Sequence, residues 1–171
     1  MYEVRFADAE VPPDRVIGVP AATSAALASA AARGAIASLA YAVGAAERVL
    51  EMTADYARTR VQFGRPIGSF QAVAHRCVDM RSDIDAVRLL TYQAAWALGT
   101  GRPSALEVSA AKAYGNEALR RIFTNAHQVF GAIGFSTDHD LHLFTRRAKA
   151  TELTWGGADQ HLRRVAVEMG L

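Results

Sequence analysis

A long apolar repeat at helical spacing constrains the fold of this chain more than any other feature. The repeat consists of Ile36, Leu39, Val43, Ala46 and Leu50. Steps of three or four residues place these side chains on one face of an α-helix. About a fifth of all residues are alanine, which also favours helix. The pattern predicts a first helix of about 35 residues, from about Ala22 to about Tyr56, with Thr23 or Ser24 as its N-cap.

Two more apolar repeats predict two further long helices. The second helix begins at Gln71, ends near Leu98 and buries the stripe Val73, Cys77, Met80, Ile84 and Val87. The third helix buries the stripe Val108, Ala111, Gly115, Leu119, Ile122, Ala126 and Val129. Ser104 and Glu107 have the spacing of a capping box and open this helix. Gly131 and Gly134 mark its end.

The last part of the chain predicts a fourth helix and a short terminal one. Asp138 or Asp140 is the expected N-cap of the fourth helix, which extends to about Thr154. Gly156 and Gly157 then interrupt the chain before a helix over residues 158–169. Long helices joined by short loops predict an all-α fold, an antiparallel up-down four-helix bundle.

The first 20 residues follow a different pattern. Residues 2–6 alternate apolar and charged side chains, as a short half-buried strand does, and Pro12 and Pro13 end the pattern. A lone strand is not stable, so we expect it to pair with something outside the bundle. The sequence thus divides into a strand remnant at residues 1–20 and a helical unit at residues 21–171.

Composition excludes several classes of protein. The chain has 171 residues and a net charge of +2, with 19 Lys and Arg against 17 Asp and Glu, so nucleic acid is not an expected partner. Cys77 is the single cysteine, which rules out an internal disulfide and fits a cytoplasmic location.

The alanine-rich segment from Ala21 to Ala46 resembles a membrane span, because Arg33 is its only charged residue. Its bulky apolar side chains are few, however, and Arg33 near the centre of a bilayer would cost about 2.5 to 3.5 kcal/mol. We therefore expect a helix packed inside a bundle and no membrane span.

Familiar catalytic and metal-binding motifs are missing. The five glutamates of the predicted long helices all lack a histidine three residues later, so a di-iron site is excluded. His139 and His142 have the spacing of metal ligands, but no third ligand is near, and we expect no metal. Cys77 lies on an apolar stripe, where cysteine usually behaves as a small buried hydrophobe. The sequence contains no nucleophile elbow, phosphate-binding loop or dinucleotide fingerprint.

Polar residues gather instead where the predicted helices end. Arg60, Gln62 and Arg65 flank Phe63 and Gly64, Gln71 begins the next helix, and Gln128 lies one turn before Gly131. One interpretation is ordinary capping in a solvated loop. The other is a ligand with phosphates and a flat polar ring, bound by arginines, amides and close backbone approach at glycine.

At these residues the sequence resembles the acyl-CoA dehydrogenases. Residues 60–71 resemble their motif R-x-x-F-G-x-x-I-x-x-x-Q, and residues 128–134 resemble their second signature, Q-x-x-G-G-x-G. Residues 146–149 resemble the R-x-A-K helix that follows. Residues 4–12 resemble the last strand of the family's middle β-domain. Three ordered motifs over about 150 residues make this likeness specific.

The resemblance implies a C-terminal helical domain that forms the core of an oligomer and binds FAD shared with another subunit. The implied FAD contacts are Arg60, Gln62, Phe63, Gln71, Gln128, Gly131, Ala132, Gly157 and Asp159. Gly156 is implied to approach the thioester of an acyl-CoA. Ala132 stands where the family usually has its second glycine.

The residue that removes the α-proton is missing from both positions the family uses. The family's glutamate precedes the glycine of a terminal Y-E-G-T motif, where this chain has Trp155, or Gly156 if the alignment shifts by one. Some relatives place the base near the position of Gly34 instead. Neither indole nor glycine accepts a proton. Glu152 and Asp159 are fallback candidates, although each has the features of a surface acid.

We therefore expect an acyl-CoA dehydrogenase-like domain without its own base, which is either a truncated family member or a noncatalytic partner subunit. It would form a homo-oligomer, or a hetero-oligomer with a full-length acyl-CoA dehydrogenase-like subunit. One alternative is a structural oligomerisation module without ligand. Another is a relative of flavin monooxygenases or nitroalkane oxidases, which share the bundle and tolerate a different base.

Overall fold

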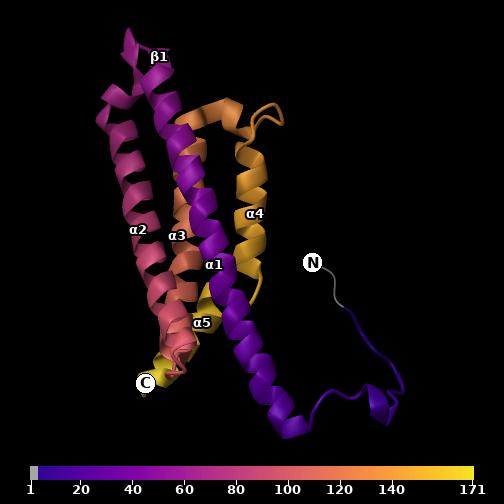
Figure 1. Ribbon diagram of the computed structural model, residues 1–171. Coiled ribbons are helices and arrows are strands. Elements are labelled where there is room, and N and C mark those ends of the chain that lie inside the picture. Colours follow the sequence, from indigo (N-terminus) through magenta and orange to yellow (C-terminus); the bar gives the residue numbers. More distant parts are fainter. Residues whose placement is uncertain (1–3) are drawn as a thin grey trace.

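The computed structural model describes residues 4–171 and is mostly helical (Figure 1), which confirms the all-α class. Its helices are α1 (Pro20–Thr59), α2 (Gln71–Gly99), α3 (Ala105–Phe130), α4 (Leu141–Leu153) and α5 (Ala158–Glu168). Helices α1, α2 and α3 lie side by side, α4 packs along α1 and α3, and α5 packs against α3. The only strands in residues 4–171 are β1 (Val61–Gln62) and β2 (Arg65–Pro66), which form a small antiparallel hairpin.

The predicted stripes of α1 and α3 form the core. All five members of the α1 stripe and all seven of the α3 stripe are buried. In α2 the prediction is confirmed for Met80, Ile84 and Val87, whereas Val73 is half-buried and Cys77 is half-buried at the edge of the core. Burial raises the pKa of the Cys77 thiol.

Gly115 allows α1 and α3 to approach closely. A Cβ atom at this position would lie 2.6 Å from Cδ2 of Leu39, a side chain that is itself fully buried. Gly44, on the exposed side of α1, has open space around the same position. A side chain would therefore clash with the core at Gly115 but not at Gly44.

The predicted N-cap of α1 is wrong, and the N-cap predicted for α3 has the right position but makes no capping bond. Helix α1 begins at Pro20 with Val19 as its N-cap, and Thr23 lies inside the first turns, donating to the carbonyls of Ile17 and Val19. Proline at the first helical position needs no N–H partner, so it begins the helix before the hydroxyl residues. Ser104 is the N-cap of α3, but its hydroxyl makes no capping bond, because its ψ of 7° departs from the extended cap geometry.

Helix α4 has Asp140 in its N-cap position, but the Asp140 carboxylate makes no capping bond. The cap is His139, whose Nδ1 accepts a hydrogen bond from the Leu141 N–H at 3.2 Å. Asp138 instead pairs with Ser136 in the preceding loop. This histidine acts on the helix end, a role that its metal-ligand spacing did not indicate.

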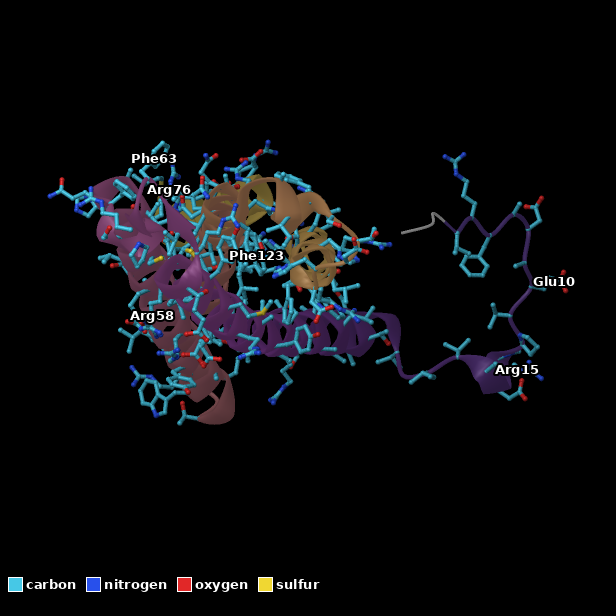
Figure 2. The ribbon with its side chains drawn as sticks, turned by 90° about the horizontal axis from the view of Figure 1, so that it is seen from above. Glu10, Arg15, Arg58, Phe63, Arg76 and Phe123 are labelled. Atoms are coloured by element: carbon cyan, nitrogen blue, oxygen red, sulfur yellow. The ribbon has the colours of Figure 1, made fainter. Side chains whose placement is uncertain are left out.

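The expected N-terminal strand is wrong for residues 4–6, which have no regular structure, and residues 1–3 lie outside the described part. Residues 4–19 form an exposed arm with a single 3-10 turn, Pro13–Arg15. Figure 2 shows Glu10 and Arg15 on this arm, well away from the bundle. Residues 4–6 pair with neither strand of the β1–β2 hairpin, and without a partner strand the alternating pattern forms no strand.

Helix α1 is long and apolar enough to cross a membrane by length and composition alone. The most apolar 18-residue stretch within residues 22–59 has a mean hydropathy of 1.4, and 28% of that stretch is buried. The bulky side chains of this helix pack against α2 and α3, and its alanine-rich start extends beyond them (Figure 1).

A lysine lies inside the core. Lys112 is completely buried in α3 and donates hydrogen bonds to the Thr151 carbonyl at 2.6 Å and to Asn116 Oδ1 at 3.0 Å. Burial lowers the pKa of Lys112 from 10.5 to about 8, opposed in part by the charge of Glu152. Since the charged form is the costly one, Lys112 makes the stability of the bundle depend on pH.

We expect Gly115→Ala to lower the free energy of unfolding by roughly 1–2 kcal/mol, because the new methyl group displaces Leu39 in a close-packed core. Gly44→Ala is the matched control and raises the same quantity by up to about 1 kcal/mol through helix propensity. Urea unfolding followed by far-UV circular dichroism measures both. Stabilisation by both substitutions contradicts the packing argument.

The second prediction concerns pH. Between about pH 8 and 10.5 the unfolded chain holds the Lys112 proton and the folded chain has released it, so the unfolded state binds more protons. The free energy of unfolding therefore rises with pH in this range, by roughly 3 kcal/mol from Lys112 alone. We expect Lys112→Met to remove this contribution, measured as the difference from wild type at each pH. Lys149→Met, which changes the only other lysine, retains it.

Candidate functional site

The turn between α1 and α2 is a tight hairpin with an exposed aromatic tip. Val61 pairs with Pro66 and Gln62 with Arg65, which leaves Phe63 and Gly64 as a two-residue turn. Both turn residues have positive φ, 52° for Phe63 and 77° for Gly64, as a type I′ turn requires. Phe63 is 92% exposed, and Figure 2 shows it at the periphery of the molecule. A strained, exposed aromatic residue is a feature of binding sites.

Packing brings the second glycine signature to the same end of the bundle as the hairpin. Tyr56, near the end of α1, stacks on Phe130, the last residue of α3, with ring centroids 4.7 Å apart. Arg76 near the start of α2 donates to Asn125 Oδ1 at 2.8 Å. The upper end of the bundle in Figure 1 therefore carries seven residues predicted to contact FAD, namely Arg60, Gln62, Phe63, Gln71, Gln128, Gly131 and Ala132.

These residues have the features needed to bind a phosphate-containing ligand. Arg60 is exposed and makes no ion pair with any residue from 4 to 171, so its charge is available to an anion. Gly131 has a φ of 64°, and nothing lies within 4 Å of where its Cβ would be, so a ligand can approach the backbone. Gln128 and Gly131 also line a cavity of about 380 Å³ between α3 and α4.

The Trp155–Gly156 segment lies between α4 and α5, away from the hairpin. Trp155 has a φ of 65° and Gly156 a φ of 105°, two consecutive residues in the left-handed region. A Cβ at Gly156 would lie 2.8 Å from both Gln160 Oε1 and His161 Nε2, so glycine is required there for space as well as conformation. Gly157 and Asp159 follow, as the N-cap and first turn of α5.

The two positions where a catalytic base was expected lie against each other. The Trp155 indole packs on Gly34 of α1, where an added Cβ would lie 2.6 Å from Cζ2 of the ring. Segments separated by more than 100 residues thus meet at one point. The space above Gly34 is filled by an aromatic ring that has no proton-accepting group.

The two fallback acids do not reach this point. Glu152 forms an ion pair with Lys149 on its own helix at 2.9 Å and lines the cavity between α3 and α4. Asp159 is exposed in the first turn of α5, where a carboxylate interacts favourably with the helix dipole. Their environments are those of ordinary surface and helix-terminal acids.

A second cavity, of about 680 Å³, lies beside Trp155 between α1, the α2–α3 loop and α5. Its walls include Trp155 and the buried His161. No sequence motif indicated His161, Lys112 and Asn116, which together surround the Trp155–Gly156 segment. Lys112 stands four residues after Val108 and three before Gly115, so a cation on an apolar stripe was the available signal.

Residues 4–171 contain no group of three or more His, Cys, Asp or Glu side chains able to hold a metal ion. His139 and His142 lie close together, but His142 Nδ1 bonds to the His139 carbonyl at 2.8 Å, and His139 Nδ1 caps α4. Both rings thus have roles in the local structure.

Comparison with known proteins identifies the family. Residues 24–170 match the family described as acyl-CoA dehydrogenase, C-terminal domain. The chain is similar to the acyl-CoA dehydrogenase FadE27 of Mycobacterium tuberculosis, with 41% identity over 138 residues, covering 76% of this chain and 37% of the relative.

Two solved structures share the fold. The ChsE4–ChsE5 complex from Mycobacterium tuberculosis matches with 41% identity and a TM-score of 0.77, over 82% of this chain and 38% of the other. PigA with FAD and proline matches with 28% identity and a TM-score of 0.91, over 97% of this chain and 43% of the other. The chain thus spans about two fifths of the length of the relatives it matches. It belongs to the acyl-CoA dehydrogenase family, and its helices correspond to the C-terminal domain of that family.

Proposed function

We propose that this chain is a noncatalytic part of an FAD-dependent acyl-CoA dehydrogenase, which completes a cofactor site but does not itself remove the α-proton. The observation that most supports this is the contact between Gly34 and Trp155. Both positions that carry the family's base are filled by groups unable to accept a proton, and they occupy the same space. Helices α1 to α4 are the equivalent of the family's four-helix domain.

The arrangement of the candidate FAD contacts favours a second chain in the site. Gly34 and Arg60 are 26 residues apart on or at the end of α1, which corresponds to about 39 Å along the helix. That span exceeds the length of one extended FAD molecule. We therefore assign the hairpin group and the Trp155 group to two different FAD molecules, which requires at least two subunits.

The residues present fit this cofactor. The hairpin end supplies Arg60 for the pyrophosphate, Gln128 for polar groups of the ADP part and Gly131 for close backbone approach. At the other end, Gly156, Gly157 and Asp159 would approach the flavin and the acyl-CoA thioester. When bound, FAD supplies the hydride acceptor for oxidation of an acyl-CoA at Cα and Cβ. The base would come from a full-length partner subunit.

An exposed apolar face on α2 is the assembly surface of this proposal. Val78, Leu89, Tyr92 and Trp96 are all more than half exposed, and their spacing places them on one side of the helix. Met80, Ile84 and Val87 fill the opposite, buried side. A second apolar face on a helix that is already packed indicates a contact between subunits. The M. tuberculosis relative in the ChsE4–ChsE5 complex favours a hetero-oligomer over a homo-oligomer.

This proposal places the protein in the cytoplasm, with α1 packed in the bundle rather than in a membrane. Two alternatives give different results. A structural module without ligand is indifferent to substitution of Arg60 or Gln128. A monooxygenase-like relative consumes oxygen when supplied with reduced flavin.

The first test is FAD binding. We expect the isolated chain to bind FAD weakly, and a mixture with a full-length acyl-CoA dehydrogenase subunit to bind it tightly. Arg60→Ala should weaken binding by the mixture at least tenfold, since a charge-assisted bond to phosphate is lost. Arg48→Ala is the control, since Arg48 is an exposed arginine of α1 whose one ion pair within residues 4–171 is with Glu51. Fluorescence titration measures each affinity.

Stoichiometric, tight FAD binding by the isolated chain contradicts this proposal, as does oxidation of any acyl-CoA by the chain alone. Unchanged affinity in both Arg60→Ala and Gln128→Ala favours the structural module instead.

The second test is assembly. We expect Leu89→Glu and Tyr92→Glu to dissociate the oligomer, because each buries a charge in an apolar contact, while the helical circular dichroism signal stays unchanged. Val11→Glu makes the same kind of change on the N-terminal arm and serves as the control. Analytical ultracentrifugation measures the mass. An unchanged mass for both α2 variants excludes this face.

A further inference from the structure

The backbone around Trp155 is held by three side chains from α3 and α5. Asn116 Nδ2 donates to the Gly156 carbonyl at 3.2 Å, and His161 Nε2 donates to the Trp155 carbonyl at 2.9 Å. Lys112 Nζ donates to the Thr151 carbonyl at 2.6 Å, in the last turn of α4. Three carbonyls within six residues are therefore fixed by buried donors.

The three donors depend on one another. Lys112 also donates to Asn116 Oδ1 at 3.0 Å, which turns the amide so that its NH₂ group faces Gly156. A carbonyl oxygen only accepts hydrogen bonds, so the His161 bond places the proton on Nε2. Burial lowers the pKa of His161, which favours the neutral ring. All three side chains are at least 99% buried, so water does not compete for these bonds.

The bonds hold a conformation that the chain does not adopt readily. A tryptophan at a φ of 65° is unfavourable because its Cβ crowds the backbone. Such conformations persist only when the surrounding structure imposes them. Here the imposed conformation directs the indole of Trp155 onto Gly34. Glycine leaves room for the ring at this position, whereas any Cβ would clash with it.

We propose that Lys112, Asn116 and His161 are positioning residues that hold Trp155 over Gly34 and so close the site of proton abstraction in this chain. This inference rests on the proposed function only in its consequence, which is that the closed site cannot remove the α-proton of an acyl-CoA. The chain is then inactive for two reasons, since it lacks a carboxylate and since the space that a substrate carbon would need is filled. Trp155 also forms one wall of the 680 Å³ cavity, so its position limits what enters there.

The test uses Trp155 as its own reporter. The full chain has two tryptophans, so Trp96→Phe leaves Trp155 as the single fluorophore. In this background Asn116→Asp keeps the side-chain shape and the Lys112 contact but removes the donor to Gly156. Trp155 is already 46% exposed, so we expect its acrylamide quenching to increase by up to about twofold and its emission to shift to the red. Lys112→Met should act in the same direction, whereas Lys149→Met should have no effect.

His161 gives a second, independent comparison. His161→Phe removes the donor to the Trp155 carbonyl and should increase quenching, while His161→Gln retains an N–H donor and should restore part of the protection. If His161 only stabilised the fold, His161→Phe and His161→Gln would increase quenching equally. Far-UV circular dichroism at the same temperature shows that each variant remains folded.

Gly34→Ala distinguishes positioning from simple loosening. Its new methyl group displaces the indole, so it should increase quenching in the reporter background. Combined with Asn116→Asp it should add little, because Trp155 has already left the site, and non-additivity of this kind measures coupling. Unchanged quenching in Asn116→Asp and His161→Phe, or fully additive effects with Gly34→Ala, overturns the inference. Neither result involves FAD or a partner, so the proposed function is tested separately.

Discussion

The close packing of α1 on α3 determines the rest of the structure. Leu39 meets Gly115 near the middle of the pair, and Tyr56 meets Phe130 near its end. From the first contact to the second, the chain advances 17 residues along α1 and 15 along α3. The two helices therefore run parallel. This register carries the hairpin and the end of α3 to one end of the bundle. It also carries Gly34 to the level where α3 supports the Trp155 segment.

Most of the fold could be predicted from the sequence because it depends on local patterns. Apolar periodicity fixed the buried faces of α1 and α3, and Gly131, Gly156 and Gly157 marked the interruptions correctly. The start of α1 was misplaced because proline at its first position outweighed the hydroxyl residues that follow. The N-terminal strand was mispredicted because alternation alone cannot supply the neighbouring strand that pairing requires.

The candidate site was predictable in composition but not in arrangement. Motif resemblance selected Arg60, Gln128 and Trp155, and the fold then separated them into two groups far apart. The contact between Gly34 and Trp155 joins residues distant in sequence, so no local rule reveals it. Lys112 gave a local signal, a cation on an apolar stripe, but its partners on the α4–α5 segment depend on tertiary packing.

The positioning bonds act on backbone carbonyls, and this explains how one framework can serve either an active or a closed site. The three donors bond to backbone carbonyls and not to the indole of Trp155, so these bonds do not require a tryptophan at that position. A carboxylate at position 155 would be directed toward Gly34 by the same bonds. A carboxylate at position 34 would instead collide with the indole. The two base positions are thus physically unequal in this chain, because the framework supports position 155 and Trp155 blocks position 34.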